Sequence, residues 1–323
     1  MDSMSHFEKQ EITTQPSRPP EFWSIMLPDE MVEEGFSLKN IIGSGSTGMV
    51  YKAIQTKVYA VKVIQWTTDS TRDIARHEYE TGKQFDHCKE TLHSLNYYEQ
   101  NMSSFIIMEY GIPCLDYFTG RDCSIRDILI TVLRVSKALE TIHAAGYTHF
   151  DVKPENIMMV NGEAKLADFS HCSQFSCNQI YNRPMGTSAY KAPEIVAGGK
   201  HTGREDMYSL GILLFVLLMA GRLPFDFSRK ESGRREPSDK IESLFIHPEL
   251  LSIIQRAAAY DASDRYPGFE EFSNDIQSFM RLHDAALDEK MPQYRMHPSL
   301  QQTALSSDTI WDGFEPENAE NKS

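Results

Sequence analysis

The sequence predicts an α+β protein of two lobes, a small β-rich lobe followed by a larger helical lobe. β-branched and aromatic runs are concentrated early in the chain, at residues 58–64 and 104–110. Helical patterns dominate the remainder, and strands followed by helices are typical of an α+β architecture. A glycine and a proline end the second run, so we expect the junction of the lobes near residues 109–113.

Each element is predicted by its own pattern. Apolar residues alternate around a glycine cluster in residues 36–54, which predicts two strands before the run at 58–64. Residues 125–145 show one wide apolar face at helical spacing, through Ile128, Leu129, Val132, Leu133, Val135, Leu139 and Ile142. Further helices are expected at 71–85, 206–220, 247–260 and 269–282.

The charge distribution predicts one folded unit between two tails. Of the net charge of −14, residues 1–34 hold −6 (eight acids, two bases) and residues 284–323 hold −5 (eight acids, three bases). The middle of the chain therefore carries −3, and acidic ends around a near-neutral centre are typical of flexible flanks. We expect a domain at 35–283, with an N-lobe at 35–110 and a C-lobe at 111–283. This balance argues against general binding to nucleic acid or anionic membranes.

The sequence also predicts a cytoplasmic protein, with the nucleus as an alternative. Residues 1–20 are polar and do not resemble a secretory signal. The longest apolar run, 210–220, falls well short of the ~20 residues of a membrane span. Five cysteines without CxxC spacing indicate free thiols in a reducing compartment.

A short polar run at residues 149–156 carries the strongest functional signal. It places Asp151, Lys153 and Asn156 close together after a helical pattern. A carboxylate, a cation and an amide oxygen are the groups that phosphoryl transfer requires. Asp168-Phe169-Ser170 and Ala192-Pro193-Glu194 follow downstream. In this order the three motifs resemble the catalytic loop, metal-binding loop and activation-segment end of eukaryotic-type protein kinases.

The resemblance implies a role for each polar residue. Asp151 would be the base or aligning carboxylate for the substrate hydroxyl, and Lys153 would neutralise charge on the transferred phosphoryl group. Asn156 and Asp168 would hold Mg²⁺, and ATP would be the phosphate donor.

A glycine-rich loop precedes these motifs. Gly43, Ser44, Gly45, Gly48 and Val50 fit the pattern G-x-G-x-x-G-x-V, in which backbone N–H groups can approach phosphates. By itself this pattern also fits a dinucleotide-binding turn or a plain flexible turn. A strand follows Gly48, however, and that strand leads to a lysine in Tyr59-Ala60-Val61-Lys62, which favours ATP.

The rest of the nucleotide site is implied by resemblance. Lys62 needs a partner carboxylate, and Glu78 stands nine residues before His87 as in the kinase αC helix; Glu80 and a plain surface acid are the alternatives. Met108 corresponds to the gatekeeper, before the hinge residues Glu109 and Tyr110, whose backbone would bind adenine. The residues expected to pack on adenine are Val50, Ala60 and Met158.

The form of the catalytic loop, D-x-K-P-x-N, resembles serine/threonine kinases, and Thr187 agrees with it. Asp206 matches the aspartate that braces the catalytic loop, and Arg265 matches the arginine that pairs with Glu194. A protein substrate is therefore expected. The rivals are a pseudokinase that binds ATP or acts as a scaffold, and a kinase of small molecules, which Thr187, Arg265 and the Ala192-Pro193-Glu194 segment disfavour.

Three residues depart from the usual kinase pattern, giving His-Phe-Asp and Asp-Phe-Ser motifs. Phe150 replaces the arginine that meets an activation-segment phosphate, so activation should not depend on phosphorylation of residues 170–186. Ser170 replaces a glycine and restricts the metal loop. Gly82 stands where an apolar side chain would pack on Phe169, which predicts a loosely held αC helix that a regulatory partner or a tail could tighten.

Overall fold

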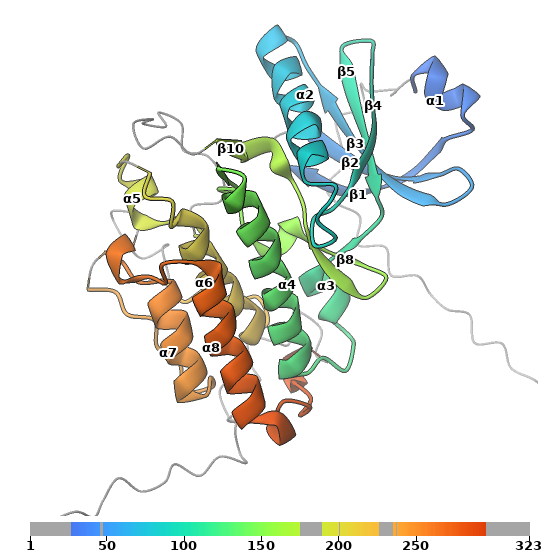
Figure 1. Cartoon of the computed structure of the whole chain (residues 1–323). Helices are drawn as coiled ribbons and strands as arrows, with labels where there is room; N and C mark the ends of the chain where they lie inside the picture. The colour runs from blue at the N-terminus through green and yellow to red at the C-terminus, as the bar shows by residue number, and fades with distance from the viewer. Residues whose placement is uncertain are drawn as a thin grey trace, which may run out of the picture.

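An antiparallel five-stranded sheet forms the N-terminal lobe (Figure 1). The computed structural model describes residues 27–45, 48–174, 189–199, 201–225, 235–236 and 238–294. The strand order is β1-β2-β3-β5-β4. The strands are β1 (Ser37–Gly45), β2 (Gly48–Ile54), β3 (Val58–Gln65), β4 (Ser94–Gln100) and β5 (Ser103–Glu109).

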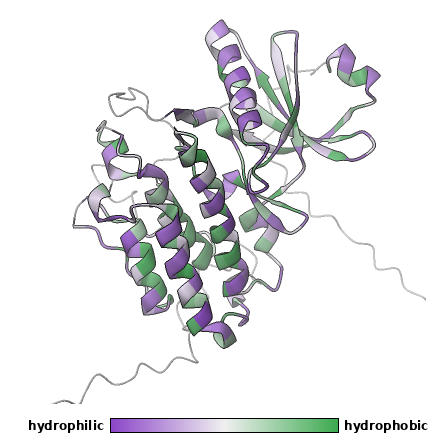
Figure 2. Cartoon of the chain, viewed as in Figure 1, coloured by the Kyte–Doolittle hydropathy of each residue, from purple (hydrophilic) through white to green (hydrophobic). Residues whose placement is uncertain are grey.

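Two helices accompany this sheet, α1 (Asp29–Glu33) and α2 (Asp69–Gln84). The side chain of Thr68 accepts a hydrogen bond from the Thr71 amide and so begins α2. Helix α2 is largely hydrophilic in Figure 2 and buries one side through residues such as Ala75. The sheet's own core includes the fully buried Val61 and Phe105.

The C-terminal lobe is helical. Its α-helices are α3 (Cys114–Phe118), α4 (Ile125–Ala144), α5 (Pro193–Val196), α6 (Glu205–Leu218), α7 (Pro248–Ala257) and α8 (Phe269–Leu282). Its short strands are β6 (Ile112–Pro113), β7 (Tyr147–Thr148), β8 (Ile157–Val160), β9 (Glu163–Leu166) and β10 (Ser173–Gln174). Its 3-10 helices are η1 (Pro154–Asn156), η2 (Phe169–His171), η4 (Ala262–Asp264), η5 (Asp284–Ala286) and η6 (Pro292–Tyr294). The predicted two-lobed α+β fold is confirmed.

The helices α4 and α6 form the centre of this lobe. A capping box between Ser124 and Asp127 starts α4, whose apolar face is buried along its length. Every residue of α6 is buried, since α4 and α7 pack against it. Gly211 permits the contact with α7, because a Cβ there would lie 2.9 Å from the Cβ of Ala257. None of the helices described is long and apolar enough to cross a membrane.

Buried residues lie on both sides of residues 35–283, the domain that the charge distribution predicts. Met31, in α1, is fully buried in the N-lobe core. Leu287, Met291 and Tyr294 are buried in the core of the C-lobe, and the Tyr294 hydroxyl donates to the carbonyl oxygen of Leu217. The expected boundaries therefore cut through packed structure at both ends.

Candidate active site

The glycine-rich loop is the turn between β1 and β2. Gly43 pairs with Val50 and Gly45 pairs with Gly48, while Ser46 and Thr47 lie outside the described residues. At Gly48 a Cβ would come within 2.5 Å of the carbonyl oxygen of Val63. This glycine is therefore required by the close approach of β2 to β3.

Lys62 lies on β3 and points to the same face as Ala60 and as Val50, its partner across the strands. Its Nζ atom lies 2.7 and 2.8 Å from the two carboxylate oxygens of Glu78 and 3.3 Å from Oδ1 of Asp168. Burial lowers the pKa of Lys62, but the two carboxylates outweigh burial and hold it above its usual range. The structure thus brings together the expected lysine and glutamate, whereas Glu80 is exposed.

Helix α2 is held in place from both sides, which fixes Glu78. On one side Arg72 and Arg76 form ion pairs with Glu99 of β4, the Arg76 pair at 3.0 Å. On the other side the imidazole Nε2 of His77 lies 2.8 Å from the carbonyl oxygen of Cys172. Burial raises the pKa of the Glu78 carboxyl, while Lys62 opposes that shift.

Asp151 stands at the centre of the catalytic loop. Its Oδ2 atom accepts hydrogen bonds from Nζ of Lys153 at 2.7 Å and from Nδ2 of Asn156 at 2.9 Å. Asn156 also donates to the carbonyl oxygen of Asp151 at 2.7 Å, so both of its amide hydrogens are used within this loop. Its amide oxygen remains as the group that can bind a cation.

Asp206, at the start of α6, binds the backbone of the catalytic loop. Its carboxylate accepts the backbone N–H groups of His149 at 2.7 Å and Phe150 at 2.8 Å, and His143 Nε2 lies 2.8 Å away. Phe150 has a φ of 66°, a left-handed conformation that is costly for a side chain of this size. The two backbone contacts stabilise that conformation immediately before Asp151. Burial raises the pKa of Asp206, but these hydrogen bonds and the histidines outweigh it and lower the pKa.

Asp168 lies at the beginning of η2, and donors from two residues meet one of its carboxylate oxygens. Its Oδ1 atom accepts the Ser170 hydroxyl at 2.6 Å, the Ser170 N–H at 3.3 Å and Nζ of Lys62. Burial opposes its ionisation, but Lys62 and Ser170 together hold the pKa of Asp168 below its usual range. The serine that replaces glycine therefore binds the carboxylate directly, a contact that the sequence argument did not foresee.

The residues present fit a magnesium ion. Asp168 supplies an ionised carboxylate and Asn156 an amide oxygen, and oxygen ligands of this kind are those that Mg²⁺ prefers. Lys62 places its ammonium group beside Asp168, with Nζ 3.3 Å from Oδ1.

The expected adenine side lies where the two lobes meet. Met108 pairs with Ala60 across β5 and β3. The backbone N–H of Glu109 donates to the carbonyl oxygen of His93, and its side chain accepts a hydrogen bond from Nζ of Lys165 at 2.6 Å. The half-buried Tyr110 lies under Nζ of Lys52, 5.5 Å from the ring centroid.

Gly111, which the sequence used to end a strand and to place the junction of the lobes, also permits a close approach of the backbone to β8. A Cβ there would lie 2.8 Å from the Cβ of Met158 on β8. The absence of a side chain lets the hinge backbone approach the residue expected to pack under adenine. The breaker signal at Gly111 could have identified this close approach.

The gap expected beside Gly82 is filled from another position. A Cβ on Gly82 would lie 3.4 Å from the Phe169 ring and 3.3 Å from the Ser94 hydroxyl. Phe85, one turn later, stacks on Phe169 with 5.7 Å between ring centroids, and His149 meets the same ring edge-on at 5.5 Å. Phe169 is therefore well packed, although Gly82 contributes no side chain.

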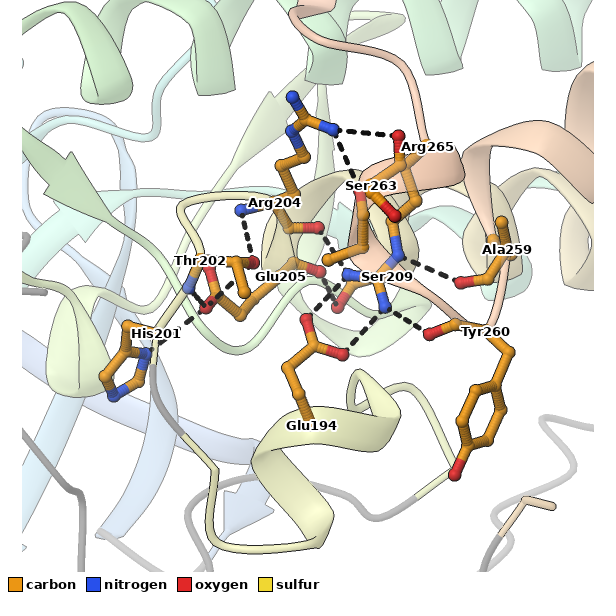
Figure 3. A network of polar contacts seen from close by, with 12 residues as sticks. Glu194, His201, Thr202, Arg204, Glu205, Ser209, Ala259, Tyr260, Ser263 and Arg265 are labelled. Carbon is orange, nitrogen blue, oxygen red and sulfur yellow. Dashed lines mark hydrogen bonds and ion pairs between the residues drawn. The ribbon is translucent and has the colours of Figure 1, made fainter. Parts of the chain in front are cut away.

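Half-buried Glu194 and buried Arg265 form an ion pair, with both guanidinium-to-carboxylate distances at 2.7 Å (Figure 3). The same guanidinium donates to the carbonyl oxygens of Arg204, Ala259 and Tyr260. Such a fork gives the segment after the activation loop a fixed position. Thr187 and Cys177 lie outside the described residues.

The buried thiols show little of the character of reactive cysteines. Burial raises the pKa of Cys114 and of Cys172, and raises the pKa of Cys123 to about 12. Nucleophilic or redox-active cysteines have lowered pKa values instead.

Comparison with known proteins agrees with this geometry. The family described as "Protein kinase domain" matches residues 36–292. Serine/threonine-protein kinase PrkC of Bacillus subtilis (strain 168) is 28% identical over 272 residues, which cover 78% of this chain and 42% of PrkC. Serine/threonine-protein kinase AtPK1/AtPK6 of Arabidopsis thaliana is 27% identical over 302 residues, which cover 86% of this chain and 63% of that protein.

A third relative, serine/threonine-protein kinase PknK of Mycobacterium bovis (strain ATCC BAA-935 / AF2122/97), is 27% identical over 81% of this chain and 25% of its own length. The chain thus spans less than two thirds of each of these relatives. On the match across residues 36–292 and the names of these relatives, the chain belongs to the protein kinase domain family, of the eukaryotic-type serine/threonine kind.

Proposed function

We propose that the protein is an active, ATP- and Mg²⁺-dependent kinase that phosphorylates serine or threonine hydroxyls of proteins. The observation that carries this proposal is the pair of hydrogen bonds that fix the Asp151 carboxylate. Its Oδ2 atom accepts one from Lys153 and one from Asn156. A carboxylate fixed in this way is prepared to accept or align a substrate hydroxyl.

Each side chain of the site has its own role in the proposed reaction. Asp151 orients the incoming hydroxyl and receives its proton, and Lys153, in contact with Asp151, stabilises charge on the phosphoryl group as it passes. Lys62, kept charged and in place by Glu78, binds the nucleotide's phosphates. Asn156 and Asp168 would hold Mg²⁺, which supplies positive charge to the phosphates when it is bound.

Serine or threonine, rather than tyrosine, is supported by Lys153 two residues after Asp151, and the relatives are named serine/threonine-protein kinases. The ion pair of Glu194 with Arg265 supports a protein substrate, since it braces the segment on which such substrates dock in related kinases.

The test is transfer of labelled phosphate from ATP, with Mg²⁺, to a generic basic protein and to the kinase itself. Asp151→Asn should reduce transfer by about 10²–10⁴-fold. Asp261→Asn, which changes an exposed aspartate just before η4, is the matched control and should leave the rate unchanged. If the wild type transfers no phosphate while ATP still raises its melting temperature, the proposal is overturned in favour of a nucleotide-binding pseudokinase.

A further inference from the structure

Two histidines and a glutamate meet at one end of the C-lobe, where α7 begins and α8 ends. His247 precedes α7, Glu249 lies in its first turn, and His283 follows the last residue of α8. One ligand atom from each residue lies within 4.8 Å of the other two. The closest pair is His283 Nε2 and Glu249 Oε2, at 2.8 Å.

The two imidazoles are held in place by packing. Their ring centroids are 4.5 Å apart, and both rings rest on Phe279 of α8, at 5.3 Å for His247 and 4.6 Å for His283. The His247 ring is fixed further, since its Nδ1 accepts the backbone N–H of Glu249 at 3.3 Å and so caps α7. The ring orientations are thus defined before any ligand arrives.

The carboxylate of Glu249 completes the cluster, with its Oε2 atom 2.8 Å from Nε2 of His283. Glu249 is 57% exposed and can turn its carboxylate toward an arriving ion.

We propose that His247, Glu249 and His283 bind a divalent first-row transition metal, with Zn²⁺ as the ion they suit best. Two imidazoles, one carboxylate and a water form a known four-coordinate zinc arrangement. Zinc ligands stand about 2.0–2.2 Å from the ion, so the side chains need to close by only on the order of 1 Å. On binding, the imidazole proton of His283 would stand on Nδ1, so that Nε2 and the carboxylate of Glu249, now joined by a hydrogen bond, would both face the ion.

This site would tie the start of α7 to the end of α8, on elements that carry none of the residues assigned to phosphoryl transfer. Mg²⁺ would not compete strongly, because it prefers oxygen ligands and keeps its waters. Zinc would therefore bind here in the presence of the magnesium that the kinase reaction needs.

The test is competition for Zn²⁺ between the full chain and a chromophoric chelator, with excess Mg²⁺ present to occupy the oxygen ligands of the active site. We expect one equivalent of zinc per chain. His283→Gln, which can still donate a hydrogen bond to Glu249, should weaken binding by at least about 10-fold, the lower end of what even an outer-shell change costs. His247→Asn keeps a capping acceptor for α7 and should weaken binding to a similar extent.

Glu249→Gln provides a third variant that leaves the fold intact, since its side chain is exposed. His87→Gln changes an exposed histidine outside the cluster and is the matched control, expected to bind as the wild type does. X-ray absorption at the zinc edge should show two imidazole ligands in the wild type and fewer in His283→Gln. Zinc affinity that is equal in the wild type and all three cluster variants, or one-to-one binding without imidazole ligands, would overturn the proposal.

Discussion

Phe150 and His201 lie ring against ring, with 4.7 Å between their centroids and an interplanar angle of 70°. The contact joins the residue before Asp151 to the segment that leads into α6. His201 is buried and lies 3.5 Å from the carboxylate of Glu205, which also accepts the Thr202 N–H at 2.5 Å (Figure 3). An aromatic pair thus packs the residue that stands in place of the arginine expected before Asp151.

Activity should therefore not require phosphorylation of residues 170–186. Phosphatase-treated protein is expected to retain its kcat/KM, because the contact between Phe150 and His201 needs no added charge. Phe150→Ala should lower the free energy of unfolding by about 1–2 kcal/mol, less than a fully buried phenylalanine would lose, because Phe150 is half-buried. Steady-state rates test the first expectation, and urea unfolding tests the second. Activity that appears only after phosphorylation of residues 170–186 would refute the first.

Gly82→Leu should destabilise the protein, because the site beside Phe169 is already full. A Cβ alone meets the Phe169 ring at 3.4 Å, so a leucine would have to displace that ring or α2. Overpacking of this kind costs about 1–3 kcal/mol, and moving α2 would also disturb the pair of Glu78 with Lys62. We expect both the melting temperature and the activity to fall.

Gly82→Ala is the control for this change, since alanine adds the single close contact and gains up to about 1 kcal/mol of helix propensity. Its stability should remain near that of the wild type. A Gly82→Leu variant that is more stable and more active would instead support the hypothesis of a loosely held α2.

Ser170→Ala should raise the Mg²⁺ concentration needed for half-maximal activity. The serine hydroxyl holds Oδ1 of Asp168 at 2.6 Å and helps to keep that carboxylate ionised and oriented. A hydrogen bond to a charged group is worth about 1.5–3 kcal/mol in stability, and even a part of that corresponds to several-fold in metal affinity. Magnesium titrations of the rate test this, with Ser170→Thr expected to stay close to the wild type.

The sequence could predict most of this site because its key contacts are local or follow a fixed order. Asp151, Lys153 and Asn156 lie within six residues, so their mutual contacts depend on a single loop. The alternation of Ala60 and Lys62 on one strand likewise determines a shared face without knowledge of the fold.

The features that the sequence missed depend on packing between distant segments. That Phe85 fills the space beside Gly82 follows from where η2 lies against α2, which no local pattern reveals. The ring contact of Phe150 with His201 joins residues that are far apart in the chain. The burial of Met31 and Tyr294 shows why charge alone misplaced the ends of the packed region: acidic stretches can contain the apolar residues that seal a core.

Asp206→Asn should destabilise the protein in a pH-dependent way. The pKa of Asp206 is lowered in the folded state, so its ionised form contributes stability at pH values above its ordinary pKa of 3.8, and this contribution is lost as the pH falls through the lower folded value. At pH 7 the variant weakens the hydrogen bonds that hold the backbone of His149 and Phe150, at a cost of about 1.5–3 kcal/mol.

The difference in unfolding free energy between the wild type and Asp206→Asn should therefore narrow between pH 5 and pH 3. Urea unfolding at several pH values measures this difference, and a gap that stays constant or widens on acidification would show that the charge of Asp206 is not what holds the catalytic loop.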